Sequence, residues 1–174
     1  MRRRSSLRIS GMTSKSCSDS APADQLLALD NQLCFALYAA NRAVTARYRP
    51  LLKELGLTYP QYLVMLVLWQ QDQNEPAPKV SELGQRLRLD SGTLTPLLKR
   101  LEERALIKRT RGAEDERVVR VALTPAGRAL RELAVSVPER LMCGLDVDPA
   151  QIVSLRDELR SLLEVLEGAE PTAQ

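Results

Sequence analysis

The chain has 174 residues, a net charge of +3 and no histidine. Its length supports one domain of ordinary size. The absence of histidine excludes Ser-His-Asp and Cys-His catalysis, histidine-based acid–base chemistry, and most zinc and haem sites. We therefore expect a protein that is not an enzyme and that uses no metal or other cofactor.

The sequence shows neither the pattern of a membrane span nor that of a secretory signal. No apolar run reaches the ~18 residues of a membrane span, and no secretory apolar stretch follows the basic residues 1–4. Three cysteines without an export signal predict reduced thiols rather than a disulfide framework. The expected location is the cytoplasm.

Charge is distributed unevenly along the chain. Residues 79–128 carry twelve basic and seven acidic side chains, whereas residues 129–174 carry four basic and nine acidic ones. A basic middle beside an acidic end is typical of a module that binds a polyanion, although an ordinary solvated surface accounts for it equally well.

The N-terminal part is predicted to contain a tail followed by helices. Residues 1–22 are rich in arginine and serine and lack an apolar period, which predicts a disordered basic tail. From Asp24 apolar residues recur at helical spacing, and we expect this first helix to end before Pro50. A short helix over 51–55 and another beginning at Thr58 follow.

The middle of the chain has the element order of a winged helix. Helices over 81–87 and 91–104, the second capped by Asp90, have helix-turn-helix spacing. Two strands, 106–110 and 118–123, then enclose a charged turn. The expected fold is mainly α, with a winged helix-turn-helix.

Two further helices are expected after the wing. Thr124-Pro125 predicts the start of a helix that runs to about Cys143, with a bend at Pro138. Asp148 then opens a last amphipathic helix, whose leucines recur at helical spacing.

The helix over 91–104 has one leucine-rich face and one polar face. Small hydroxyl side chains allow close approach to base edges, and basic ones suit phosphates. An arginine at a hairpin tip can enter the narrow minor groove, with Asp115 holding Arg117 in position. The candidate DNA-binding residues are Ser91, Thr93, Thr95, Lys99, Arg100, Arg109, Arg111, Asp115 and Arg117.

Cys34 lies among apolar residues of the first predicted helix and precedes Tyr38, Tyr48 and Tyr59. The residues alone leave two interpretations open, a small buried hydrophobic side chain or a reactive thiol, and the first is the commoner. A phenol hydroxyl near the sulfur would donate to a thiolate and favour it. Tyr38 is one helical turn away.

Four segments resemble a known family. Residues 90–102 (DSGTLTPLLKRLE), 114–117 (EDER) and 123–127 (LTPAG) resemble the MarR family of winged-helix regulators, and 29–38 (LDNQLCFALY) resembles its organic-hydroperoxide-sensing, OhrR-type branch. The resemblance covers roughly residues 24–167.

The resemblance implies a homodimer on a palindromic double-stranded DNA operator. Each subunit would form a single domain over residues 23–174, with a winged helix at about 57–123. N- and C-terminal helices, at about 24–55 and 124–167, would form the dimerisation region.

The resemblance also assigns roles to the cysteines. A cysteine matching Cys34 is the peroxidatic residue, tyrosines matching Tyr48 and Tyr59 hydrogen-bond to it, and one matching Tyr38 lies close by. A cysteine matching Cys143 marks the two-cysteine subtype and forms a disulfide with the sensing cysteine of the other subunit.

The resulting expectation is a redox-sensing transcriptional repressor, bound to operator DNA when reduced and released when organic hydroperoxides oxidise Cys34. Three alternatives stay open: a MarR-type regulator answering a small aromatic or phenolic ligand, a thiol peroxidase, and an architectural DNA-binding protein. Cys143 as a core-lining residue is the alternative to its role as disulfide partner.

Overall fold

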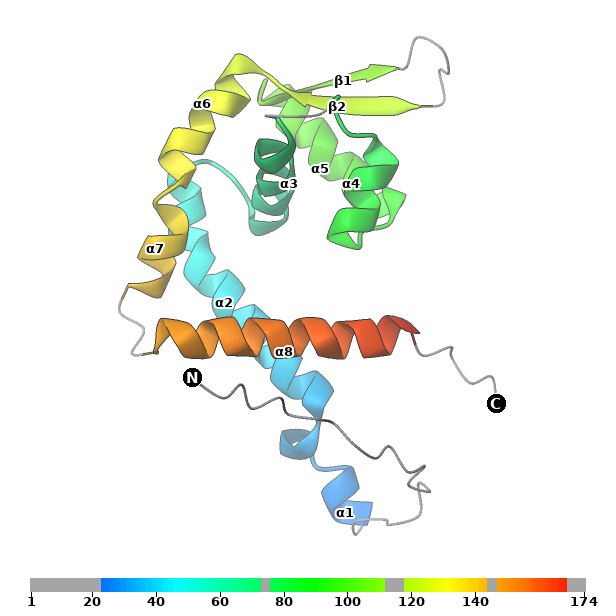
Figure 1. Ribbon diagram of the computed structural model, residues 1–174, viewed down its shortest axis with the longest axis vertical. Helices are drawn as coiled ribbons and strands as arrows, with labels where there is room; N and C mark the ends of the chain where they lie inside the picture. The colour runs from blue at the N-terminus through cyan, green and yellow to red at the C-terminus, as the bar shows by residue number, and fades with distance from the viewer. Residues whose placement is uncertain (1–22, 73–75, 112–117, 144–146, 169–174) are drawn as a thin grey trace, which may run out of the picture. The chain divides into compact units, whose positions relative to one another are not determined.

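The computed structural model describes residues 23–72, 76–111, 118–143 and 147–168 (Figure 1). Its contacts divide the chain into two units, residues 1–46 and 47–174. The predicted tail and most of the predicted wing turn lie outside the described residues.

The first helical region is interrupted, whereas the sequence predicted one continuous helix. It contains α1 (Ala23–Leu26), the 3-10 helix η1 (Leu29–Asn31) and α2 (Leu33–Glu54). α2 therefore begins nine residues later than expected from Asp24, and this shift decides the setting of Cys34.

Side-chain amides account for the interruption. The Asn31 amide donates a hydrogen bond of 2.9 Å to the carbonyl of Gln25, and the Gln32 amide donates to the carbonyls of Leu26 and Ala28. Those carbonyls would accept backbone N–H groups in a continuous helix, so the side chains compete with it.

Pro50 does not end the helix, contrary to the expectation from sequence. α2 continues through it, so the short helix expected over 51–55 is largely the last turn of α2. An interior proline removes one hydrogen bond, and burial of Leu52 and Leu55, 1% and 6% exposed, offsets that loss. Gly56 follows with φ of 64°, as expected of a residue that terminates a helix.

The second unit contains the predicted winged helix (Figure 1). α5 and the hairpin follow α3 and α4, and the strands pair antiparallel with Ile107 opposite Leu123. The elements are α3 (Tyr59–Gln71), α4 (Val80–Leu87), α5 (Ser91–Glu103), β1 (Ile107–Arg111) and β2 (Val119–Leu123).

Three helix starts predicted from capping residues are confirmed. The Asp90 carboxylate accepts the N–H of Thr93 at 2.9 Å, ahead of α5. The Thr124 hydroxyl accepts the N–H of Gly127 at 3.0 Å. At Thr58 the backbone N–H donates to the Gln61 side chain at 2.9 Å, which closes a capping box for α3.

The segment after the wing forms two helices, where the sequence predicted one bent helix. α6 (Pro125–Ala134) ends ahead of Ser136, and α7 (Val137–Met142) begins one residue before Pro138. The break precedes the proline because a proline is tolerated in the first turn of a helix but not in its interior. α8 (Pro149–Gly168) opens after Asp148, as predicted.

The core of the second unit joins these elements. The buried indole N–H of Trp69 donates to the carbonyl of Gly127 at 2.8 Å and ties α3 to α6. Gly127 lies so close to the carbonyl of Leu106 that a Cβ would overlap its oxygen. The fully buried side chains include Tyr62, Met65, Leu83, Leu94, Leu98, Leu101, Ile107, Val121 and Val137.

Among the described helices, none is both long and apolar enough to cross a membrane.

Candidate functional site

α5 presents the polar face that its sequence predicts. Leu94, Leu98 and Leu101 are buried, while the predicted contact residues of the helix face solvent. The Thr93 hydroxyl donates to Asp90 at 2.7 Å, and the Thr95 hydroxyl donates to the carbonyl of Ser91 at 2.7 Å. The exposed residues are Ser91, Thr93, Thr95, Lys99 and Arg100.

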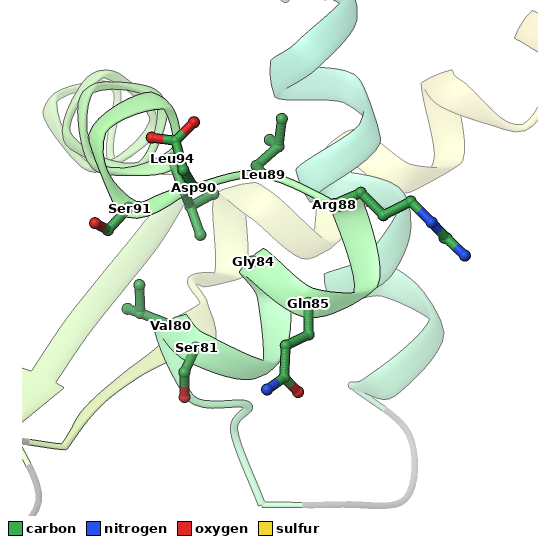
Figure 2. Close-up of a pocket in the computed structure, with 9 residues that line it drawn as sticks. All are labelled: Val80, Ser81, Gly84, Gln85, Arg88, Leu89, Asp90, Ser91 and Leu94. Carbon is green, nitrogen blue, oxygen red and sulfur yellow. The ribbon is translucent and has the colours of Figure 1, made fainter. Parts of the chain in front are cut away.

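A hollow of about 530 Å³ lies between α4 and α5 (Figure 2). Val80 and Leu94 form apolar parts of its wall, while Ser81, Gln85 and Ser91 contribute polar side chains. These polar groups come from both helices of the helix-turn-helix.

Arg109, predicted to contact DNA, is held by Glu102 in this structure. Its guanidinium donates to the carboxylate at 2.6 and 2.9 Å, and its backbone N–H donates to the same carboxylate at 2.9 Å. These bonds link β1 to α5. Arg111 is exposed at the end of β1, whereas the predicted wing residues Asp115 and Arg117 lie outside the described residues.

The Glu102–Arg109 pair should make the stability of the winged helix depend on pH. Hydrogen bonds from the Arg109 side chain, and then from its backbone N–H, lower the pKa of Glu102. A carboxyl with a lowered folded-state pKa stabilises the fold above its unfolded value and loses that contribution as pH falls through the folded value.

We expect Glu102→Gln to remove that contribution. The loss of unfolding free energy near neutral pH should be no more than ~1 kcal/mol, because the pair is partly exposed, and should vanish in acid. Urea unfolding across pH 3–7 measures it, with Glu103→Gln as the matched control. A Glu102→Gln variant whose pH profile parallels the wild type would contradict the assignment.

Cys34 is the second residue of α2 and is exposed in this chain. The buried interpretation of this cysteine therefore fails within the described chain. The N-terminal turn of a helix favours negative charge because its N–H groups have no intrahelical acceptor. Cys34 therefore lies in the turn whose backbone N–H groups have no intrahelical acceptor.

A cation that the sequence interpretation missed accompanies Tyr38. The Arg42 guanidinium donates to the Tyr38 hydroxyl oxygen at 3.0 Å and lies 5.5 Å from the ring centre. Positions 34, 38 and 42 follow the four-residue spacing of one helix face, which is the signal that would have found Arg42. Because Arg42 donates to the phenol oxygen, the phenol hydrogen is free to point elsewhere.

Tyr48 and Tyr59 come together in the second unit, as part of a group that also contains Tyr62. The ring centres of Tyr48 and Tyr59 are 5.0 Å apart, and those of Tyr48 and Tyr62 are 5.8 Å apart. Burial, and then the neighbouring phenols Tyr62 and Tyr59, raise the pKa of Tyr48. A protonated phenol is a hydrogen-bond donor, so this group suits a negatively charged acceptor.

Cys143 follows α7 directly and is exposed. Its backbone N–H donates to the carbonyl of Glu139 at 2.9 Å, and Arg140, one turn earlier, forms an ion pair with Glu54. Within the described ranges no group of three or more metal-binding side chains is found.

A helix-turn-helix with an exposed polar second helix and a charged hairpin defines a DNA-reading regulator of the winged-helix class. The family model described as "Transcriptional regulator SarA/Rot" matches residues 46–132. The chain belongs to the MarR/SarA-like family of winged-helix transcriptional regulators, as its resemblance predicted.

Two curated relatives are similar over most of their length. The "Organic hydroperoxide resistance transcriptional regulator" of Bacillus subtilis is 47% identical over 79% of this chain and 91% of its own. The "HTH-type transcriptional regulator TtmR" of Methylorubrum extorquens is 45% identical over 87% of this chain and 79% of its own.

A solved structure shows the same fold on DNA. Reduced AbfR bound to DNA is 36% identical, covers 81% of this chain and 96% of its own, and has a TM-score of 0.64; the protein comes from Staphylococcus epidermidis. AbfR has also been solved overoxidised on DNA and with a disulfide formed.

Proposed function

We propose that this chain is a redox-sensing repressor that binds operator DNA when Cys34 is reduced and leaves it when an organic hydroperoxide oxidises Cys34. The observation that carries the proposal is the exposed Cys34 in the first turn of α2, with Tyr38 and Arg42 following on the same face. The Bacillus relative, named for organic hydroperoxide resistance, supports the choice of oxidant.

The chemistry begins with transfer of one oxygen atom. The Cys34 thiolate attacks the distal oxygen of ROOH, the O–O bond breaks, and the alkoxide takes a proton to leave as ROH. The sulfur is oxidised to sulfenic acid and the hydroperoxide is reduced to an alcohol. Donation from the phenols of Tyr38, Tyr48 and Tyr59 would stabilise the reacting thiolate.

A second step would fix the oxidised state. The Cys143 thiol of another subunit attacks the sulfenic sulfur, a disulfide forms, and water leaves with the sulfenic oxygen. Disulfide geometry requires Cα atoms within about 7 Å of each other, so this step forces α7 to move unless the two sites already meet. That AbfR has been solved with a disulfide formed supports such an outcome.

Two exposed apolar faces support a homodimer. Leu33 and Leu37 of α2 are 58% and 36% exposed, and Leu155 and Leu159 of α8 are 52% and 40% exposed; α8 has no buried residue. Long amphipathic helices need a partner for such faces. A second copy would cover them and present two winged helices to a palindromic double-stranded operator.

The proposed DNA contact is tested by substituting an arginine of the wing. We expect Arg117→Gln to weaken operator binding about tenfold and to reduce the slope of log affinity against log salt by about 1, because one cation is lost from the interface. Fluorescence anisotropy at several salt concentrations measures both. Arg156→Gln on α8 removes the same charge from a residue that is not among the predicted DNA contacts, and equal losses in both variants would contradict the wing contact.

The redox proposal is tested by titrating labelled operator with reduced protein before and after an alkyl hydroperoxide, and again after a thiol reductant. We expect release on oxidation and recovery on reduction. An operator complex that is unaffected by the hydroperoxide would contradict the proposal.

A further inference from the structure

The C-terminal end of α2 and the three residues after it, residues 52–57, receive two arginine side chains, one from α7 and one from the residue that follows α5. Arg140 of α7 forms a two-pronged ion pair with Glu54, with both N–O distances at 2.7 Å. Arg104, directly after α5, donates to the carbonyl of Leu55 at 3.1 Å and to the carbonyl of Gly56. We call residues 52–57 the α2 joint.

The α2 joint holds these two contacts in a fixed position relative to each other. The side chains of Leu52, Leu55 and Leu57 are buried, and the N–H of Leu57 donates back to the carbonyl of Leu52 at 2.9 Å. A helix end closed in this way, with its apolar side chains packed, moves as a unit rather than deforming internally.

Two observations favour glycine at position 56. Its φ of 64° favours glycine, and a Cβ there would lie 2.6 Å from the Arg104 guanidinium. The glycine therefore gives the Arg104 side chain room to reach two carbonyls that the end of α2 leaves without helical partners.

The two arginines connect functionally distinct elements. Arg104 caps the end of α5, the helix that presents the predicted DNA-contact residues. Arg140 lies one turn before Cys143, the predicted disulfide partner, on a helix of six residues. A displacement of α7 would therefore act first on Glu54, and a displacement of the α2 joint would act on the end of α5.

Stability alone gives a weak reason for these contacts. Glu54 and Arg140 are exposed, and exposed ion pairs contribute little to folding. Two-pronged guanidinium contacts do, however, fix direction as well as distance. These contacts therefore matter because they fix the relative positions of the groups they join, rather than because they stabilise the fold.

We propose that the α2 joint transmits the state of α7 to α5: Glu54 and Arg140 form the input contact, and Arg104 is a positioning residue for operator binding. The inference rests on the proposed redox function, because it takes the disulfide at Cys143 to be the event that moves α7. Coupling between two sites is measured by the ratio of affinities in the two states.

The input contact is tested with Arg140→Gln and with the charge-reversed pair Glu54→Arg plus Arg140→Glu. For each protein the operator Kd is measured reduced and after hydroperoxide. Arg140→Gln should lower the oxidised-to-reduced Kd ratio about tenfold, within the usual range of coupling factors, while the crosslink to Cys143 still forms. The reversed pair should restore most of the ratio.

The positioning role is tested in reduced protein alone. Arg104→Gln should weaken operator binding about tenfold without changing the salt slope, because Arg104 binds carbonyls rather than phosphate. Arg104→Lys keeps the positive charge but not the planar guanidinium that donates to two carbonyls, and it should give a similar loss of operator affinity. Thermal unfolding of every variant separates this effect from a loss of folded protein, and Arg156→Gln is the control.

An unchanged affinity ratio in Arg140→Gln, or a full-affinity Arg104→Gln, would overturn the inference. A wild-type protein that never leaves its operator on oxidation would instead refute the proposed redox function and the input contact with it. The Arg104 measurements on reduced protein would still decide the positioning role.

Discussion

Cys34→Ser is expected to bind operator with the affinity of the reduced wild type and to remain bound in the presence of an alkyl hydroperoxide. Serine replaces one exposed side-chain atom, and such surface changes alter the free energy of unfolding by no more than about 0.5 kcal/mol, so the fold that binds operator is retained. A hydroxyl does not take an oxygen atom from ROOH, so the first chemical step is lost. Operator titrations with and without hydroperoxide measure the effect.

Cys17→Ser is the matched control, because Cys17 has no role in the proposal. It should respond to hydroperoxide like the wild type. A Cys34→Ser protein that still left its operator would remove Cys34 as the sensor. If a small aromatic compound also released that variant, the ligand-responsive alternative would be favoured.

Cys143→Ser is expected to abolish the disulfide-linked dimer on a non-reducing gel after hydroperoxide treatment. The Cys34 sulfenic acid would then lack its thiol partner and persist, or react onward with a small thiol or more oxidant. Operator release should become incomplete or more easily reversed, because no covalent bond holds α7 in its new position. Gel mobility and operator titration on the same samples measure both effects.

A crosslink of undiminished yield in Cys143→Ser would exclude this cysteine as the partner and would direct attention to Cys17. The double variant of Cys17 and Cys143 is the control for that outcome, because it leaves Cys34 as the single cysteine. A dimer crosslink in that variant would join two copies of Cys34.

The winged helix was predictable because its signals are local. Asp90 and Thr124 cap the helices that follow them, and both bonds are present in the structure. The buried leucines of α5 recur at helical spacing, which leaves the hydroxyl and basic residues on the opposite face. Caps and periodicity depend only on residues within one or two helical turns, so a sequence reveals them.

The first helix was predicted incorrectly because side-chain competition with the backbone is not visible in apolar spacing. Leu26, Leu29 and Leu33 keep a helical rhythm across a region that the amides of Asn31 and Gln32 interrupt. The prediction therefore placed Cys34 in the body of a helix. The structure places it in the first turn of α2, where it is exposed.

The partners of the arginine side chains were the other feature that the sequence did not predict. Arg109 is predicted to contact DNA from its place on the wing, and the structure adds an intramolecular partner, Glu102, which binds its guanidinium and backbone N–H. Arg42 is absent from the predicted site, although it donates to the Tyr38 hydroxyl oxygen. An arginine in a basic segment has several possible partners, and only coordinates show which one it contacts.

The central claim is that oxidation of Cys34 and loss of operator binding are one event. The most direct measurement follows both in the same samples, using intact and peptide mass for the state of Cys34 and anisotropy for bound operator, across a hydroperoxide titration. The account predicts that bound operator falls in proportion to the fraction of Cys34 in disulfide with Cys143. Full operator affinity with all Cys34 in that disulfide would contradict it.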